Sequence, residues 1–277
     1  MLARAMTWNS TVFQAAAVAG PGIAGLLIAL GGTALTVYAV NMVCLLLAMG
    51  AALAITPRAL LGNMRGPRRV SSWREMFGGL NHVWNTKVVF GAMTVDLFAV
   101  LLVGATALLP LYAKDILHTG AAGLGWLSAA PAIGAVLMAV SSGHRKAPAH
   151  AGRTFLWAVG AFGLATVVFG LSTNYWLSLF ALIAIGASDN MGAVIRQTAV
   201  QLFTPDELRG RVAAVNRVFI SSSNELGAVE SGMAAALLGP VAAVVAGGAI
   251  TMLIAAAGFK LFPALRELET VQGKRMR

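Results

Sequence analysis

The chain has 277 residues, of which 58% are hydrophobic and only 11% are charged, and its mean hydropathy is +0.79. Since an ordinary soluble domain carries about 25% charged residues, this composition excludes a soluble globular protein and predicts an all-α integral membrane protein. The net charge of +10 does not indicate a nucleic-acid partner, because the basic residues gather in connections that fall on one side of the predicted membrane.

Eight apolar segments are each long enough to cross about 30 Å of hydrocarbon as a helix. In chain order they cover 11–30, 34–55, 88–112, 123–140, 154–171, 176–200, 212–238 and 241–262. On one side, the connections at 31–33, 172–175 and 239–240 are short and carry no Lys or Arg, and the connection at 113–122 carries only Lys114. The other connections hold most of the basic residues, so the positive-inside rule predicts a multi-pass protein of the cell membrane with both termini in the cytoplasm. We expect no removable signal peptide, because a transmembrane-length apolar run follows the first residues.

The longest connection, 57–87, begins with a basic, turn-rich part. Its second part has apolar residues at helical spacing after a pair of serines, namely Trp73, Met76, Phe77, Leu80 and Trp84. This pattern is typical of an amphipathic helix. We interpret this stretch as a surface helix that rests on the lipid headgroups; a regulatory binding site is the alternative.

The first sixty residues match the last part of the chain at an offset of 207 positions. The matched pairs are Arg4 with Arg211, Asn9 with Asn216, Gly20 with Gly227, Gly25 with Gly232, Leu30 with Leu237 and Gly32 with Gly239. Each copy has a basic residue, a polar helix start, two glycines and a hairpin that leads into a plain apolar helix. Transporters built from two related halves contain repeats of this kind.

Carboxylates and other polar side chains lie inside three of the predicted spans. The acids are Asp96, Asp189, Glu225 and Glu230, and Arg196 and Asn224 accompany them. On a helical wheel, the polar residues of 212–238 occupy two faces. Because a carboxyl group in hydrocarbon costs several kcal/mol, this helix is expected to be enclosed by protein or water.

No pattern for catalysis, metal binding or a cofactor occurs in the sequence. Cys44 is the single cysteine and the four histidines are scattered, so we expect no disulfide and no metal site. The sequence has no phosphate-binding Gly-Lys-Ser/Thr loop. We therefore expect neither an enzyme nor an ATP-driven pump.

Three stretches resemble the major facilitator superfamily of secondary transporters, and within it a bacterial efflux branch. They are TWNSTVFQAAAVAGPGIAGLLIALGG at 7–32, TPDELRGRVAAVNRVF at 204–219 and NELGAVESG at 224–232. The first is similar to the antiporter motif of the family: Gly20, Pro21 and Gly25 match it, while Ala16 and Ala24 stand where glycines are usual. The resemblance implies secondary active transport of the antiporter type.

The resemblance implies that the eight segments correspond to the fifth through twelfth helices of a twelve-helix plan. The chain then divides into 1–56, a two-helix hairpin of the N-terminal half; 57–87, a cytoplasmic linker; 88–264, a complete six-helix C-terminal bundle; and 265–277, a basic tail. In the family, the segments at 88–112 and 176–200 line a central cavity. Those at 11–30, 123–140 and 212–238 form the contact between halves, and the other three face lipid.

The implied function is ion- or proton-coupled export of a small molecule by alternating access, with the lipid bilayer, the substrate and protons as partners. Since one hairpin cannot form half of such a machine, we expect the chain alone to be inactive. The alternative is a non-transporting structural or regulatory membrane protein derived from a transporter.

The candidate residues fall into two groups. Asp96, Asp189, Arg196, Asn224, Glu225 and Glu230 are candidates for the transport pathway or for proton coupling; Gly20, Pro21, Gly25, Gly227 and Gly232 are candidates for helix packing or gating. A buried carboxyl group such as Asp189 or Glu225 can bind and release a proton, because burial disfavours its charged form. Structural pairing of these charges between helices is the alternative.

Overall fold

The computed structural model describes residues 2–30, 33–54, 73–144 and 148–269, and every regular element in these residues is a helix. The long helices are α1 (Leu2–Ala29), α2 (Ala34–Ala54), α4 (Lys87–Leu101), α6 (Ala121–His144), α7 (Ala151–Leu171), α8 (Tyr175–Leu202), α9 (Arg209–Leu238) and α10 (Pro240–Leu261). The shorter elements are α3 (Trp73–Asn85), α5 (Leu109–Leu111), the π-helix η1 (Tyr112–Ile116) and α11 (Pro263–Arg266). Much of the predicted basic linker and tail, at 55–72 and 270–277, falls outside the described residues.

Five of the described helices, α2, α6, α7, α8 and α10, are long and apolar enough to cross a membrane. A sixth span results if the end of α3 and the whole of α4, which meet at an angle of 96°, are taken together. Helix α9 has 30 residues, but charged and polar side chains interrupt its apolar surface. The chain is therefore a helical, multi-pass membrane protein, and the number of eight spans remains a prediction.

The predicted continuous span at 88–112 is wrong. Helix α4 ends at Leu101, and helical structure resumes only at Leu109. At the interruption, a side chain at Gly104 would overlap the Ser231 side chain of α9, and glycine disfavours a helix by about 1 kcal/mol relative to alanine. The interruption therefore lies where Ser231 of α9 packs against this segment.

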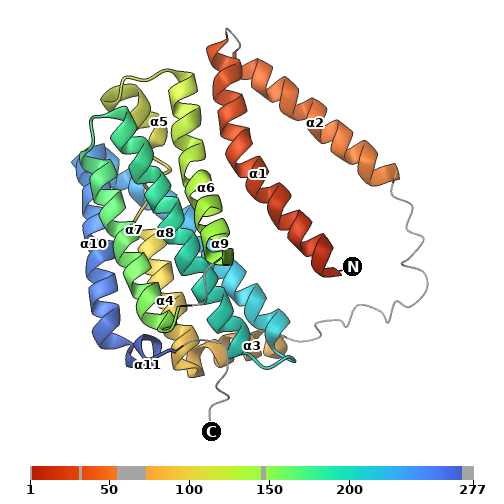
Figure 1. The fold of residues 1–277 in the computed structure, drawn as a ribbon, viewed down its shortest axis with the longest axis vertical. Helices are drawn as coiled ribbons and strands as arrows, with labels where there is room; N and C mark the ends of the chain where they lie inside the picture. The colour runs from red at the N-terminus through yellow and green to blue at the C-terminus, as the bar shows by residue number, and fades with distance from the viewer. Residues whose placement is uncertain (1, 31–32, 55–72, 145–147, 270–277) are drawn as a thin grey trace.

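Six helices form one bundle, in which α7 lies between α8 and α10, α6 packs on α8, and α9 packs on α4 and α10 (Figure 1). A cluster of buried residues around Leu127, Phe169 and Leu182 fills one end of this bundle, and a second around Val95, Phe155 and Ile195 fills the other. Helices α1 and α2 stand beside the bundle, and only α1 contacts it extensively, along α6. No residue of α2 is buried.

The α1–α6 contact is a close crossing of two backbones. A Cβ atom at Gly25 would lie 2.6 Å from the carbonyl oxygen of Ala121 and 2.9 Å from the Cα of Gly125. A Cβ atom at Gly125 would lie 2.7 Å from the carbonyl oxygen of Pro21. Small residues allow membrane helices to approach in this way, so this glycine pair fixes where the α1–α2 hairpin meets the bundle.

The helix boundaries agree with the internal repeat. Moved by 207 positions, α1 would cover 209–236 and α2 would cover 241–261, whereas α9 and α10 cover 209–238 and 240–261. The repeat therefore relates two helical hairpins of nearly equal length.

The predicted amphipathic helix is present as α3. It contacts α9 and α4, and the Nε2 atom of His82 lies 2.9 Å from the carbonyl oxygen of Phe203, directly after α8. Helix α3 and α11 lie at the same end of the bundle (Figure 1).

Candidate functional site

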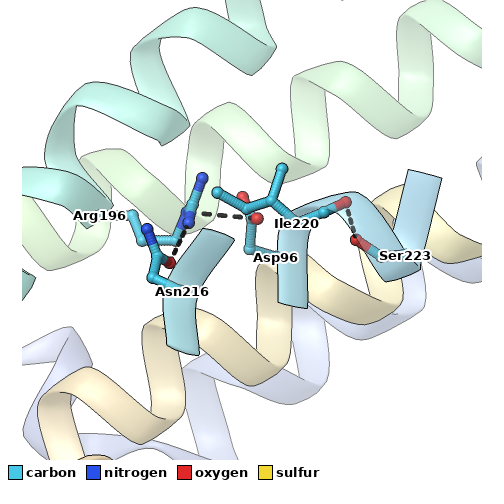
Figure 2. Close-up of polar contacts among 5 residues, drawn as sticks. All are labelled: Asp96, Arg196, Asn216, Ile220 and Ser223. Atoms are coloured by element: carbon cyan, nitrogen blue, oxygen red, sulfur yellow. Dashed lines mark hydrogen bonds and ion pairs between the residues drawn. The ribbon is translucent and has the colours of Figure 1, made fainter. Parts of the chain in front are cut away.

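Three helices of the bundle bring a charged cluster together. Asp96 comes from α4, Arg196 from α8 and Asn216 from α9. The Nε atom of Arg196 lies 3.2 Å from Oδ2 of Asp96, and Nη1 of Arg196 donates a 2.7 Å hydrogen bond to Oδ1 of Asn216. Figure 2 shows the guanidinium group between the carboxylate and the amide. Arg196 thus joins two other helices through one side chain.

The cluster is enclosed by protein. The side chain of Arg196 is 5% exposed and that of Asp96 is 14% exposed. An unpaired charge at such a position is strongly destabilising, whereas a paired one with further hydrogen bonds is tolerated. Among the described residues, Nε of Arg196 donates no hydrogen bond of the usual geometry, so the contact with Asp96 is mainly ionic. An ionic contact of this kind requires less strict alignment than a bidentate pair.

A second carboxylate lies next to the pair. Asp189 is two helical turns before Arg196 on α8, and it lines, together with Asp96, a small cavity between α4, α7 and α8. The cavity volume is about 10 Å³, close to the space that one water molecule needs. The rest of its lining is formed mainly by small and apolar residues: Ala99, Val100, Val159, Phe162, Ser188 and Gly192. Asp189 itself is exposed. The site therefore holds an enclosed Asp96–Arg196 pair and, beside it, a second carboxylate that is open to the surroundings of the bundle.

The other predicted pathway residues lie elsewhere. Asn224, Glu225 and Glu230 are all exposed on α9, outside the cluster. Glu230 accepts a 3.3 Å hydrogen bond from the hydroxyl of Ser231. Glu225 makes no hydrogen bond or ion pair within the described part of the chain. Of the six candidates, the structure brings together Asp96, Asp189 and Arg196.

Asn216 was not among the predicted site residues, although two signals pointed to it. It is matched by Asn9 in the internal repeat, and it lies on the same stripe of α9 as Ser223 and Gly227. Both of these residues are buried, and Ser223 donates its hydroxyl to the carbonyl oxygen of Ile220, one turn from the cluster (Figure 2). A polar residue on the packed face of a membrane helix is itself a sign of an interhelical hydrogen bond.

The predicted packing residues divide into two kinds. Gly25 and Pro21 take part in the crossing with α6, and a side chain at Gly227 would meet the carbonyl oxygen of Leu101 at 2.8 Å. Gly20 and Gly232 have open space around them. Pro21 lies inside α1 without ending it, so its role in gating stays a prediction.

Metal binding finds no support in the part of the chain that the structure describes, since no three His, Cys, Asp or Glu side chains there are grouped closely enough to hold a metal ion. The cluster of Asp96, Asp189 and Arg196 is instead suited to binding a proton or a small charged group, because its two carboxylates share one permanent positive charge.

Comparison with known proteins identifies the family of the chain. The family model MFS_3, described as transmembrane secretion effector, matches residues 1–276. The chain is 28% identical over 235 residues to the enterobactin exporters EntS of Escherichia coli O81 (strain ED1a) and Shigella dysenteriae serotype 1 (strain Sd197). These alignments cover 83% of this chain and 54% of each relative, so the chain spans about half the length of the curated relatives that it matches. The chain belongs to the transmembrane secretion effector family of major facilitator transporters.

Proposed function

We propose that this chain forms the C-terminal part of an exporter that moves a small molecule across the cell membrane by alternating access, with a proton or another ion as the coupling partner. Its membership of a transporter family and its relatives' names support a role in transport rather than an enzymatic one. They also favour transport over a purely structural or regulatory role. Enterobactin, which names those relatives, is the first substrate to test.

The charged cluster carries this proposal. Arg196 links α8 to α4 through Asp96 and to α9 through Asn216. One guanidinium group can neutralise only one of the two nearby carboxylates, so a proton on the other completes the charge balance. The positions of α4, α8 and α9 then depend on the protonation state of the cluster. This dependence is what couples ion movement to a conformational change.

The topology belongs to the same proposal. Eight spans, with both termini in the cytoplasm, follow from the basic connections of the sequence. The hairpin 1–56 acts as the portion of the N-terminal half, 57–87 as the linker, 88–264 as the C-terminal half and 265–277 as the tail. In this arrangement Asn224, Glu225 and Glu230 lie at the boundary between the two halves.

Gene replacement in the source organism tests the proposal with every natural partner present. Cells with the wild-type gene, a deletion or the substitution Asp189→Asn are compared by mass spectrometry of small molecules in the medium, enterobactin first. We expect the deletion and Asp189→Asn to lower the same secreted compound at least tenfold. Asp115→Asn, which changes an exposed acid of η1, is the matched control and is expected to secrete like the wild type.

Two results contradict the proposal in different ways. An unchanged set of secreted compounds in the deletion strain excludes export as the function. Normal secretion by Asp189→Asn, with the same dependence on external pH as the wild type, excludes the coupling role of this carboxylate.

A further inference from the structure

An aromatic contact joins α3, α4 and the segment that follows α10. The ring centroid of Trp84 lies 5.0 Å from that of Phe90, and the Phe90 centroid lies 6.4 Å from that of Phe262 in an edge-to-face arrangement. The Phe262 ring fills the space beside Gly91, where a Cβ atom would lie 2.8 Å from it. These rings therefore hold three segments together at the end of the bundle where α3 and α11 lie (Figure 1).

The turn between α3 and α4 fixes the depth of this aromatic contact in the membrane. Thr86 separates the two helices, and the end of α3 meets α4 at 96°. Because α3 is nearly perpendicular to α4, it runs along the membrane surface when α4 crosses the membrane. Trp84, at the end of α3, is 67% exposed although it stacks on Phe90. An exposed tryptophan at this depth is typical of the headgroup region.

Two lysines flank the aromatic contact. Lys87 is three residues before Phe90, and Lys260 is two residues before Phe262, so each lies within one helical turn of a contacting ring. Both lysines are exposed. Neither of them makes a hydrogen bond or an ion pair in the described part of the chain. Two free positive charges therefore lie close to one exposed aromatic surface.

An apolar strip on α10 continues from the lysines toward the middle of the bundle. It consists of Ile250, Leu253 and Leu261, which are 41%, 68% and 71% exposed. Their spacing of three and eight residues places them on one face of the helix. The surface thus has the two parts that contact with a phospholipid requires: cationic side chains at the depth of the headgroups and apolar side chains at the depth of the acyl chains.

Charge complementarity favours an anionic phospholipid over a zwitterionic one. Basic residues close to the membrane surface attract anionic lipids, and each additional basic residue strengthens the attraction. Glu267, the first acid after α10, lies 3.2 Å from Arg266, so it does not neutralise either lysine. A soluble anion would meet the same two lysines, but it would leave the apolar strip on α10 uncovered.

We propose that Trp84, Lys87 and Lys260 form a binding site for one anionic phospholipid. The lipid belongs to the leaflet at the α3 end of the bundle, which is the cytoplasmic leaflet in the proposed topology. The two ammonium groups bind its phosphate, the indole N–H of Trp84 donates to a headgroup oxygen, and an acyl chain covers the apolar strip on α10. The bound lipid thereby joins the linker helix α3 to α10. This site is separate from the charged cluster and goes beyond the export proposal.

Native mass spectrometry of the detergent-purified chain tests the site. The chain is titrated with phosphatidylglycerol, and phosphatidylcholine with the same acyl chains is the reference. We expect the first phosphatidylglycerol to bind at least tenfold more tightly than phosphatidylcholine. The double variant Lys87→Gln with Lys260→Gln is expected to abolish this difference, and each single variant to reduce it about threefold. The matched control, Lys114→Gln with Arg153→Gln, removes the same charge from two other exposed residues and is expected to retain the full difference.

Each other outcome overturns the proposal. Equal binding of the two lipids by the wild type shows that the site does not select an anionic headgroup. An equal loss in both double variants means that net charge alone attracts the lipid. Displacement of the bound lipid by 1 mM glycerol phosphate identifies a site for soluble phosphate esters. If the double variant aggregates, the single variants decide, and full lipid selectivity in both refutes the site. Because the readout is lipid binding, a failure here leaves the export proposal standing.

Discussion

Asp96→Asn is the substitution that most directly tests the charged cluster. It removes the negative charge 3.2 Å from Nε of Arg196 while preserving the shape of the side chain. At an effective dielectric constant near 20, this separation corresponds to about 5 kcal/mol of Coulomb attraction. The amide of Asn216 still accepts one hydrogen bond from Arg196, but it carries no charge to balance the guanidinium group.

We expect Asp96→Asn to lower the free energy of unfolding by about 3–5 kcal/mol, the usual cost of leaving one partner of a buried ion pair uncompensated. For a chain of this size, the loss corresponds to a decrease in Tm of roughly 10 °C. Asp189 does not take the place of Asp96 against the guanidinium group, because it lies on α8 itself, two turns or about 10 Å along the helix axis from Arg196. The measurement is the temperature at which the detergent-purified protein loses its monodisperse elution peak.

The double variant Asp96→Asn with Arg196→Gln removes both charges and is expected to regain at least about 2 kcal/mol of that loss, because no buried charge is then left unpaired. Asp206→Asn is the control, since it breaks the Arg209–Asp206 pair, whose side chains are 57% and 79% exposed, and exposed pairs contribute little. Equal, small Tm changes in Asp96→Asn and Asp206→Asn, or additive losses in the double variant, refute the reasoning.

Two further substitutions test the helix contacts. Gly25→Leu places a side chain against the backbone of Gly125 and is expected to separate α1 from α6. The measurement is the distance between a spin label on Cys44 and one on α6, which is expected to increase. The control Gly20→Leu meets open space and is expected to leave that distance unchanged. Asn216→Ala removes the 2.7 Å bond to Arg196 and is expected to cost about 1–3 kcal/mol in the same Tm assay. A loss no larger than that of Ser223→Ala, whose hydroxyl bonds only within α9, contradicts the linking role of Asn216.

The helical hairpins were the most predictable part of the fold. Apolar length and short polar connections placed the helices at 151–171 and 175–202 to within a few residues, because a single property, the transfer of apolar side chains into lipid, decides these boundaries. The internal repeat located the two related hairpins as well, because its single offset of 207 positions relates the boundaries of α1 and α2 to those of α9 and α10. The interruption at 102–108 was not predictable in this way, because it lies inside an apolar stretch, at a position where Gly104 packs against Ser231 of the distant helix α9.

The charged cluster was only half predictable. The sequence identified Asp96, Asp189 and Arg196 as unusual, because charged groups inside membrane spans are expensive. It could not reveal that Arg196 pairs with Asp96, one hundred residues away, rather than with Asp189 on its own helix. That choice depends on the positions of α4, α8 and α9 relative to one another, and local periodicity contains no information on it.

The polar character of α9 also depends on the position of this helix relative to its neighbours. A membrane helix that faces lipid on one side needs apolar residues only on that side, and α9 has them in Leu226, Val229 and Met233. Its packed side accommodates Asn216 and Ser223 because each finds a hydrogen-bond acceptor or donor there. Glu225, on the remaining side, is exposed and makes no hydrogen bond or ion pair within the described residues. The polar residues therefore make α9 a poor isolated span, although those on its packed side are well accommodated once the helix lies against its neighbours.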